Sequence, residues 1–127
     1  MLRKTLFAEP FLEDVDRKAL AILRKAGKVV VASSTSEEVL AKEVKDADAL
    51  LVRSAKITRR VIESGAELKA VASIRVGLDH IDVEAATEKG VFVLRPEYAN
   101  TDSVAEHTFC LLLAVAKNLL KANRELG

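Results

Sequence analysis

Cysteine, tryptophan and long apolar runs are scarce in this sequence. The single cysteine, Cys110, cannot form a disulfide within the chain, which excludes a disulfide-stabilised secreted domain and favours a reducing compartment. The longest uninterrupted apolar run, residues 109–116, falls well short of the roughly 20 residues that span a membrane. Glu9 interrupts the short apolar stretch near the start, so no signal peptide is expected. We therefore expect a cytoplasmic protein without a membrane segment.

Neither sign of charge is in excess. Twenty Lys and Arg residues against nineteen Asp and Glu residues leave a formal net charge of +1, and the two signs are interspersed along the chain. The basic stripe of a nucleic-acid-binding domain is therefore missing. Proline is also scarce, with two residues, whereas half of the sequence is apolar. Such a composition is typical of one folded domain, which at 127 residues can bury roughly two thirds of its unfolded surface.

Short runs rich in Val, Ile and Leu alternate with helical patterns, which indicates a parallel sheet with helices on both faces. Five strands are predicted, at residues 4–8, 28–32, 49–52, 69–73 and 91–94. The helices are predicted at residues 12–26 and 35–44, from Thr58 to Gly65, from Asp82 to Gly90, and at residues 101–126. The predicted fold class is α/β, a flavodoxin-like arrangement of three layers around a five-stranded parallel sheet, with a long C-terminal helix.

Polar caps and glycines define the predicted helix ends. Thr35 and Glu38 have the spacing of a capping box at the start of the second helix. Gly27, Gly65 and Gly90 each follow a helix, and we explain them as helix stops. Gly27 in particular is expected in the left-handed conformation that ends the first helix.

The last predicted helix, residues 101–126, differs from the others. Ser103 and Glu106 have capping-box spacing at its start, which gives Glu106 a structural role. Between Phe109 and Leu120 the helix is apolar almost all round, which a helix on one face of a small sheet does not need. We therefore expect a homodimer built partly on this stretch.

Polar residues follow the predicted strands where ligands of open parallel sheets bind, beyond the carboxyl ends. These positions are Glu9, Ser33, Ser34, Arg53, Ser54 and residues 74–77 and 95–101. Arg53, Arg75 and Arg95 each stand just past a strand end, and a guanidinium group binds a carboxylate or phosphate in a fixed fork. The sequence thus predicts a small anionic ligand.

Gly77 is the internal glycine that no helix stop explains. It lies in the connection 74–79, where the lack of a side chain would let backbone N–H groups close on a carboxylate. The alternative is that Gly77 makes a turn and binds nothing. Both interpretations stay open on physical grounds.

Common catalytic and metal-binding motifs are missing from the sequence. There is no G-x-G-x-x-G, no Walker loop, no nucleophile elbow and no pair of His or Cys at metal-ligand spacing. His80 is expected at the surface or in a loop and His107 in the last helix, and both are interpreted as structural. Cys110 is interpreted as a small buried apolar residue. We therefore predict no catalytic residue and no metal site in these 127 residues.

Two segments resemble a known family. Residues 68–95, LKAVASIRVGLDHIDVEAATEKGVFVLR, and residues 100–116, NTDSVAEHTFCLLLAVA, are similar to the D-isomer-specific 2-hydroxyacid dehydrogenases, above all to their phosphoglycerate dehydrogenase branch. The two segments have the order and spacing of that family. With ADALLVRSAKIT before them, the resemblance covers residues 47–120, and the first 46 residues fit only a generic β-α-β start.

The resemblance implies an NAD- or NADP-dependent oxidoreductase acting on D-2-hydroxy acids. Residues 1–100 would be its substrate-binding domain and residues 101–127 a helix for interdomain and dimer contacts. The implied substrate-binding residues are Arg53, Ser54, Val76, Gly77 and Asn100, and Val76 also matches a position close to the nicotinamide. These residues coincide with the strand-end positions selected above.

The sequence departs from the family at two points. The family commonly has Arg followed by small residues before V-G, whereas this sequence has Ser73, Ile74 and Arg75. Arg75 could bind a second negative group such as a phosphate, or it could point outward. The family's nucleotide domain and its catalytic Arg, Glu and His lie beyond the last helix and outside these 127 residues. We therefore expect a truncated chain that binds no cofactor and has no dehydrogenase activity alone.

An alternative is a non-catalytic module of flavodoxin-like fold that binds a small anion or takes part in signalling. A response-regulator receiver would need clustered acids after the first strand and Asp after the third, where the sequence has a lone Glu9 and Arg53. A flavodoxin would need a phosphate loop rich in hydroxyl groups and glycine after the first strand. A sensor that binds a small anion without catalysis stays open.

Overall fold

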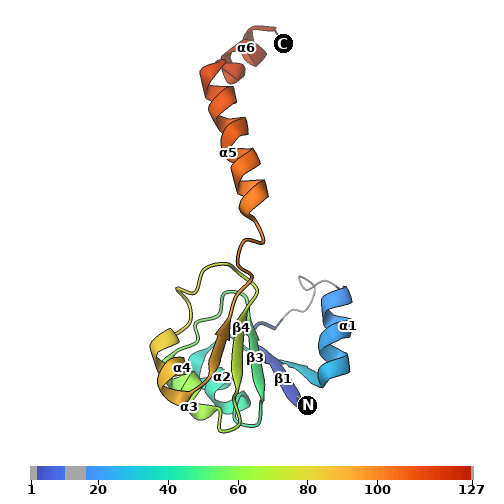
Figure 1. The fold of residues 1–127 in the computed structure, drawn as a ribbon, viewed down its shortest axis with the longest axis vertical. Coiled ribbons are helices and arrows are strands. Elements are labelled where there is room, and N and C mark those ends of the chain that lie inside the picture. Colours follow the sequence, from blue (N-terminus) through green and yellow to red (C-terminus); the bar gives the residue numbers. More distant parts are fainter. Residues whose placement is uncertain (1–2, 11–16, 127) are drawn as a thin grey trace. The chain divides into compact units, whose positions relative to one another are not determined.

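The computed structural model describes residues 3–10 and 17–126, and it divides into two compact units at Pro96. In the first unit, five strands form one parallel sheet in the order β2-β1-β3-β4-β5 (Figure 1). The strands are β1 (Lys4–Phe7), β2 (Lys28–Val31), β3 (Ala49–Val52), β4 (Ala70–Ser73) and β5 (Phe92–Leu94). All five predicted strands are confirmed, and the strand order is that of a flavodoxin-like sheet.

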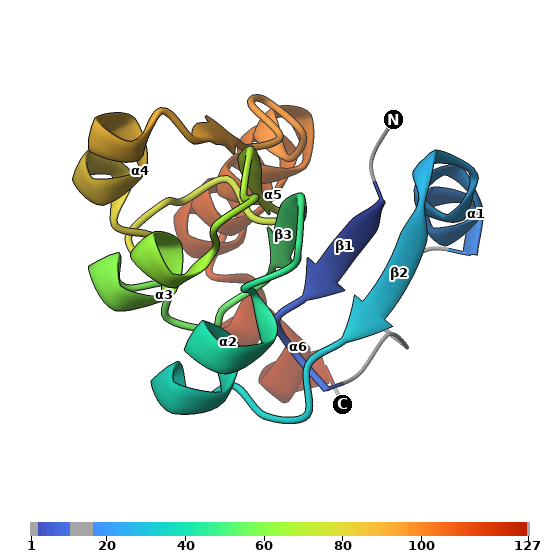
Figure 2. The ribbon, with the colours of Figure 1, turned by 90° about the horizontal axis from the view of Figure 1, so that it is seen from below.

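Helices cover both faces of this sheet, as predicted. The first unit contains α1 (Arg17–Ala26), α2 (Glu37–Glu43), α3 (Arg59–Ser64) and α4 (Val83–Lys89). Figure 2 shows α2, α3 and α4 together on one side of the sheet and α1 on the other. The predicted start of the first helix, residues 12–16, lies outside the described residues.

Burial differs between the two faces of the sheet. On the side of α2, α3 and α4, the inward residues Leu6, Leu50 and Val71 are fully buried. On the other side the exposed fraction rises toward the β5 edge, from 1% at Phe7 to 74% at Phe92. A parallel sheet is normally covered on both faces, so the β5 end of this second face is an uncovered apolar surface within the first unit.

The predicted helix ends are confirmed at α4. The Asp82 carboxylate accepts a hydrogen bond from the Ala85 amide at 2.8 Å, which satisfies one of the free N–H groups of the first turn. Gly90 has a φ of 74° and ends α4 in the left-handed conformation.

Two other predicted details of the helix ends are wrong. The N-cap of α2 is Ser36 and not Thr35, and its side chain makes no cap hydrogen bond. Gly27 and Gly65 follow α1 and α3 as the predicted stops, but Gly27 lacks the expected positive φ, and the φ of Gly65 is −79°. The Gly27 amide still donates to the Leu23 carbonyl at 3.1 Å, so the chain passes into β2 without a left-handed turn.

A lysine, and not a left-handed glycine, closes the end of α3. Lys89 Nζ donates to the carbonyl oxygens of Ile62 at 2.6 Å, Glu63 at 3.0 Å and Gly65 at 2.6 Å. The last carbonyls of a helix lack partners within the helix and carry partial negative charge, so an ammonium group stabilises them. This contact holds α4 against α3.

Asp48 joins three strands at the amino-terminal edge of the sheet. Its side chain is fully buried and accepts hydrogen bonds from the amides of Arg3 at 2.8 Å and Lys4 at 3.0 Å and from Lys69 Nζ at 2.9 Å. The Lys69 hydrogen bond, helped by the two amides, holds the pKa of Asp48 well below its usual range. The start of β1 is thereby fixed to the starts of β3 and β4.

The second unit contains two helices where one was predicted. They are α5 (Thr101–Ala116) and α6 (Leu119–Leu126), with an angle of 56° between them. Asn118 has a φ of 48° at the break, and asparagine tolerates this left-handed conformation better than other residues with a side chain. No single helix among the described residues has the length and apolar content to cross a membrane. Helices α5 and α6 have that length and apolar content only when they are taken together as this bent pair.

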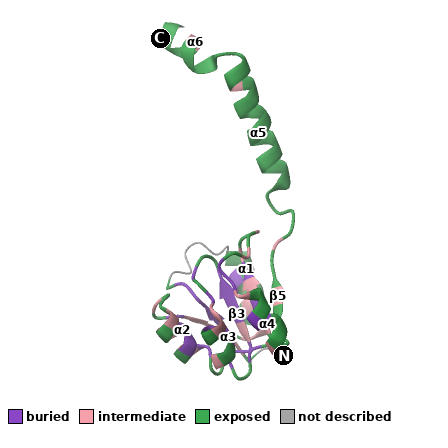
Figure 3. Cartoon of the chain, turned by 90° about the vertical axis from the view of Figure 1, so that its left-hand side faces the viewer, coloured by how far each residue is buried: buried purple, intermediate pink, exposed green. Residues whose placement is uncertain are grey.

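Two further expectations for α5 are wrong. Asn100 is the N-cap, so Ser103 and Glu106 lie inside the helix and do not form a capping box. Cys110 is exposed and not buried. Figure 3 shows α5 exposed along almost its whole length, because α6, the other helix of the second unit, leaves most of its apolar side chains uncovered.

The lowered pKa of Asp48 predicts acid sensitivity. Its folded pKa lies below the ordinary 3.8, so the stability it contributes is present above that value and is lost as the pH falls. Urea unfolding should show a free energy of unfolding that decreases between about pH 5 and pH 2, with a smaller decrease in Asp48→Asn. Asp48→Asn should also be less stable at pH 7. Parallel pH profiles for the two proteins would contradict this assignment.

Candidate functional site

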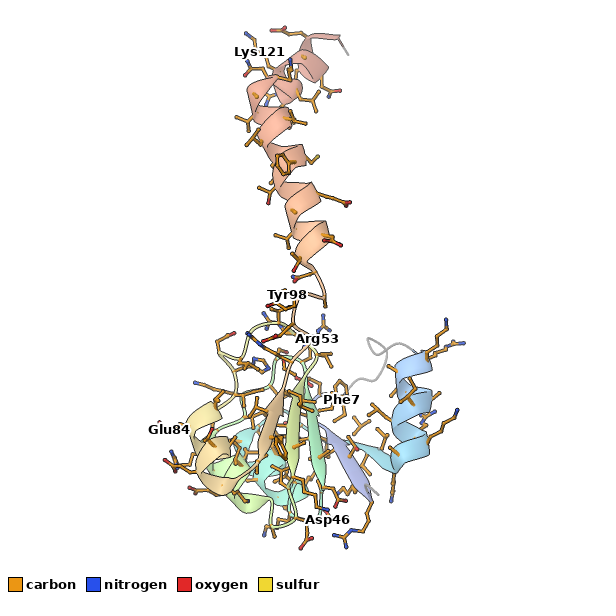
Figure 4. All side chains as sticks on the ribbon, in the orientation of Figure 1. Phe7, Asp46, Arg53, Glu84, Tyr98 and Lys121 are labelled. Carbon is orange, nitrogen blue, oxygen red and sulfur yellow. The ribbon has the colours of Figure 1, made fainter. Side chains whose placement is uncertain are left out.

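The loops that follow β3 and β4 form the candidate site. Strands β3 and β4 are neighbours and run parallel, so their carboxyl ends meet at one edge of the sheet. Figure 4 places Arg53 at this edge and Asp46 at the opposite one. The predicted site residues Arg53, Ser54, Arg75, Val76 and Gly77 all lie in these two loops.

The β3 loop is held from below by a buried carboxylate. Glu9, 3% exposed, follows β1 and accepts hydrogen bonds from the amides of Arg53 at 3.1 Å, Ser54 at 2.7 Å and Ala55 at 2.7 Å. The side chains of Arg53 and Ser54 are exposed. The predicted position of Glu9, at the carboxyl edge of the sheet after β1, is confirmed. The sequence pattern predicted no role for it.

Backbone contacts tie the β3 loop to the β4 loop. The Ile74 amide donates to the Val52 carbonyl at 2.9 Å, which extends the strand pairing by one residue. Ile57 and Ile81 then form an isolated parallel bridge, with the Ile57 amide 2.8 Å from the His80 carbonyl. The two loops are therefore held in a fixed relation at both of their ends.

Within the β4 loop, the backbone of Arg75 is fastened to a buried serine. Ser73 Oγ donates to the Arg75 carbonyl at 2.9 Å and accepts from the Arg75 amide at 3.0 Å. Arg95 Nη1 donates to the Val76 carbonyl at 3.3 Å. Arg95, at the end of β5, thus joins the same edge. The side chains of Arg53, Arg75 and Arg95 are all exposed there.

Gly77 does not need to be glycine for its backbone conformation, because its φ is not positive. A Cβ built at this position would lie 2.8 Å from Asp79 Oδ1, so a larger residue would displace the Asp79 side chain. Asp79 is exposed and its carboxylate is the end of a flexible side chain, so this contact is only a weak steric reason for glycine. The predicted contact of its backbone with a carboxylate stays a prediction.

His80 lies in a turn, as one of its two expected placements had it, but it is buried and not at the surface. The residue is 8% exposed, its Nε2 lies 3.5 Å from Ser73 Oγ, and Nδ1 has no hydrogen-bond partner among the described residues. A hollow of about 270 Å³ adjoins it, lined by Lys56, Ile57, Thr58, Asp79, His80, Ile81 and Asp82. None of the predicted substrate-binding residues lines this hollow.

Other predicted positions have structural partners or lie elsewhere. Ser33 donates through its amide to Glu43 Oε2 at 3.1 Å and also hydrogen-bonds Glu43 through its hydroxyl group, which fixes the end of β2 to α2. Asn100 belongs to the second unit, as the N-cap of α5, so its assignment to the site stays a prediction. Among the described residues, no group of three His, Cys, Asp or Glu could hold a metal ion.

Known proteins are similar to this chain in sequence and in fold. The chain is 46% identical over 124 residues to D-3-phosphoglycerate dehydrogenase of Methanocaldococcus jannaschii, which covers 97% of this chain and 23% of that protein. The solved PH0520 protein of Pyrococcus horikoshii is 30% identical, with a TM-score of 0.81 over 98% of this chain and 36% of that one. The NAD⁺-bound 3-phosphoglycerate dehydrogenase of Entamoeba histolytica is 29% identical, with a TM-score of 0.73 over 90% and 39%.

The chain therefore spans about a quarter of the length of that archaeal relative and less than two fifths of the two solved structures. Residues 9–123 match the family model described as the catalytic domain of the D-isomer specific 2-hydroxyacid dehydrogenases. The chain belongs to the D-isomer specific 2-hydroxyacid dehydrogenase family.

Proposed function

We propose that this chain is the substrate-binding part of a cytoplasmic D-2-hydroxyacid dehydrogenase, with 3-phosphoglycerate as the first candidate substrate. The observation that carries the proposal is the pair of linked loops after β3 and β4, which present Arg53 and Arg75 at the edge where parallel sheets bind ligands. The family and the names of the relatives support the substrate class.

The proposed residues bind different groups of the substrate. Arg53 and Ser54 bind one end of the acid, and the backbone of Val76 and Gly77 binds its carboxylate. Arg75 binds a second negative group such as a phosphate, for which a guanidinium group provides a matching fork of donors. The family resemblance also assigns Asn100 to substrate binding, and we propose that role for it.

The described residues fit a nicotinamide ring better than a whole dinucleotide. Val76 is half-buried, which suits contact with a flat ring, and one solved relative contains NAD⁺. The sequence has no G-x-G-x-x-G with which a helix start would bind the pyrophosphate. NAD or NADP therefore belongs to the complete enzyme, and we propose that this chain alone binds neither and transfers no hydride.

The first test measures catalysis by the 127-residue chain alone. Incubation with NADH or NADPH and 2-oxo acids, including 3-phosphohydroxypyruvate, should leave the absorbance at 340 nm unchanged, because the chain lacks a nucleotide fingerprint. A full-length family enzyme serves as the positive control. Oxidation of either cofactor by the chain would contradict the proposal that it transfers no hydride alone.

The second test measures binding by isothermal titration calorimetry. Arg53→Ala should weaken binding of both 3-phosphoglycerate and D-glycerate by about 10- to 100-fold, the cost of about 1.5–3 kcal/mol for a lost hydrogen bond to a charged group. Arg75→Ala should weaken only 3-phosphoglycerate. Arg60→Ala removes an exposed arginine on α3 and should change neither affinity. Equal losses for both acids in Arg75→Ala would refute the phosphate role.

We also propose that the chain forms a homodimer through the apolar stretch between Phe109 and Leu120. Phe109, Leu112 and Val115 are more than half exposed in the second unit, and soluble proteins seldom leave such a continuous apolar surface uncovered. A groove of about 780 Å³ between α5 and α6 is lined by Leu111, Ala114, Val115, Asn118, Leu120, Lys121, Arg124 and Glu125. A second copy would cover this surface.

Multi-angle light scattering tests the dimer. At micromolar concentration the chain should have twice its monomer mass of 13.8 kDa, and Leu112→Glu should shift it to monomer because it buries a charge in the interface. Ile22→Glu changes an exposed apolar residue on α1 and should leave the mass unchanged. A monomeric wild-type chain would rule the dimer out.

A further inference from the structure

We propose that Glu9 is a positioning residue for the substrate: its buried carboxylate fixes the β3 loop so that Arg53 and Ser54 face the anion. This inference rests on the proposed function, because it concerns how the same site binds its ligand. Neither the family match nor the motifs of the sequence assign a role to Glu9.

The geometry of the Glu9 carboxylate carries the inference. Oε1 accepts the amides of Arg53 at 3.1 Å, Ser54 at 2.7 Å and Ala55 at 2.7 Å, and Oε2 lies 3.1 Å from the Arg53 amide. Three consecutive amides thus point inward at one side chain. Such a run of amides is an anion-binding nest, and here an internal anion occupies it.

Because the Glu9 carboxylate occupies this nest, the amides of residues 53–55 are not available to a ligand. While the three amides donate to Glu9, the β3 loop can bind an incoming acid only through the side chains of Arg53 and Ser54, and both are exposed. A buried carboxylate is costly unless its hydrogen bonds are made, so Glu9 holds the loop in this one conformation. Its effect on the substrate is therefore exerted through the loop.

Asp48 provides a matched comparison within the same sheet. It is also a buried carboxylate that accepts backbone amides, those of Arg3 and Lys4, but it lies at the opposite edge of the sheet. Loss of Asp48 should lower stability and leave the ligand loops in place. A purely structural role for Glu9 would make the two losses equivalent, whereas a positioning role makes only Glu9 matter for binding.

The experiment measures the affinity for 3-phosphoglycerate by calorimetry in the wild-type chain, Glu9→Gln, Asp48→Asn, Arg53→Ala and the double variant Glu9→Gln/Arg53→Ala. Gln has nearly the shape of Glu but offers one neutral acceptor to three amides. We expect at least a tenfold loss in Glu9→Gln and less than a twofold change in Asp48→Asn. The double variant should bind within about threefold of Arg53→Ala alone, because both changes disable the same contact.

Amide spectra of the same proteins separate positioning from unfolding. In folded Glu9→Gln, the proton shifts of the Arg53, Ser54 and Ala55 amides should move upfield while the rest of the spectrum is kept. Should Glu9→Gln fail to fold, Glu9→Asp keeps the charge on a shorter side chain and should show the same loop-specific shift with a smaller loss of affinity. In the wild-type chain the protons of these three amides should exchange with solvent more slowly than those of other loop amides.

Each remaining outcome decides the question. Wild-type affinity in Glu9→Gln, or in Glu9→Asp where that variant is used, would overturn the positioning role and leave the proposed function intact. An equal loss of affinity in Asp48→Asn would also overturn it, because the loss would then follow stability. Failure of the wild-type chain to bind 3-phosphoglycerate or D-glycerate would overturn the proposed function and the role of Glu9 with it.

Discussion

The pairing of β1 with β3 supports both the core and the candidate site. The two strands pair in register at the centre of the sheet, and a buried carboxylate stands at each end of the pair. At the amino-terminal edge, Asp48 from the β3 side accepts amides at the start of β1. At the carboxyl edge, Glu9 from the β1 side accepts amides after β3. A slip of one strand against the other would leave both carboxylates buried without partners, so the register is strongly fixed.

This arrangement separates a rigid site from an exposed helical unit. Backbone hydrogen bonds hold the loops after β3 and β4 to the sheet and to each other. Loops that are fixed in this way hold their side chains in reproducible positions. The second unit instead exposes its apolar residues, and β5 exposes Phe92 and Leu94 on one face of the sheet. Both apolar surfaces are of a kind that other protein segments or subunits cover. The proposed dimer surface and the loops after β3 and β4 therefore lie in different units of the chain.

Sequence patterns predicted the sheet well because buried parallel strands are short apolar runs between helices, as at residues 49–52. The positions of Arg53 and Arg75 at the carboxyl edge followed from the same rule. The errors arose where a residue's environment depends on distant partners. The apolar run around Cys110 suggested burial, but within the second unit Cys110 is exposed on α5. His80 has polar neighbours in the sequence, which suggested exposure, yet it is buried, with its imidazole 3.5 Å from Ser73 Oγ at the end of β4. Asn118 carried a detectable signal, since asparagine favours the left-handed conformation that ends α5.

The hydrogen bonds between Glu9 and the β3 loop affect how such a site can change in evolution. Glu9 accepts hydrogen bonds from the main-chain amides of residues 53–55, and every residue except proline supplies that donor. Side chains at positions 53 and 54 can therefore be exchanged without loss of these hydrogen bonds. A scaffold of this kind can acquire acids of different size and charge as substrates by a few substitutions in one loop, while the sheet beneath keeps its sequence and its stability.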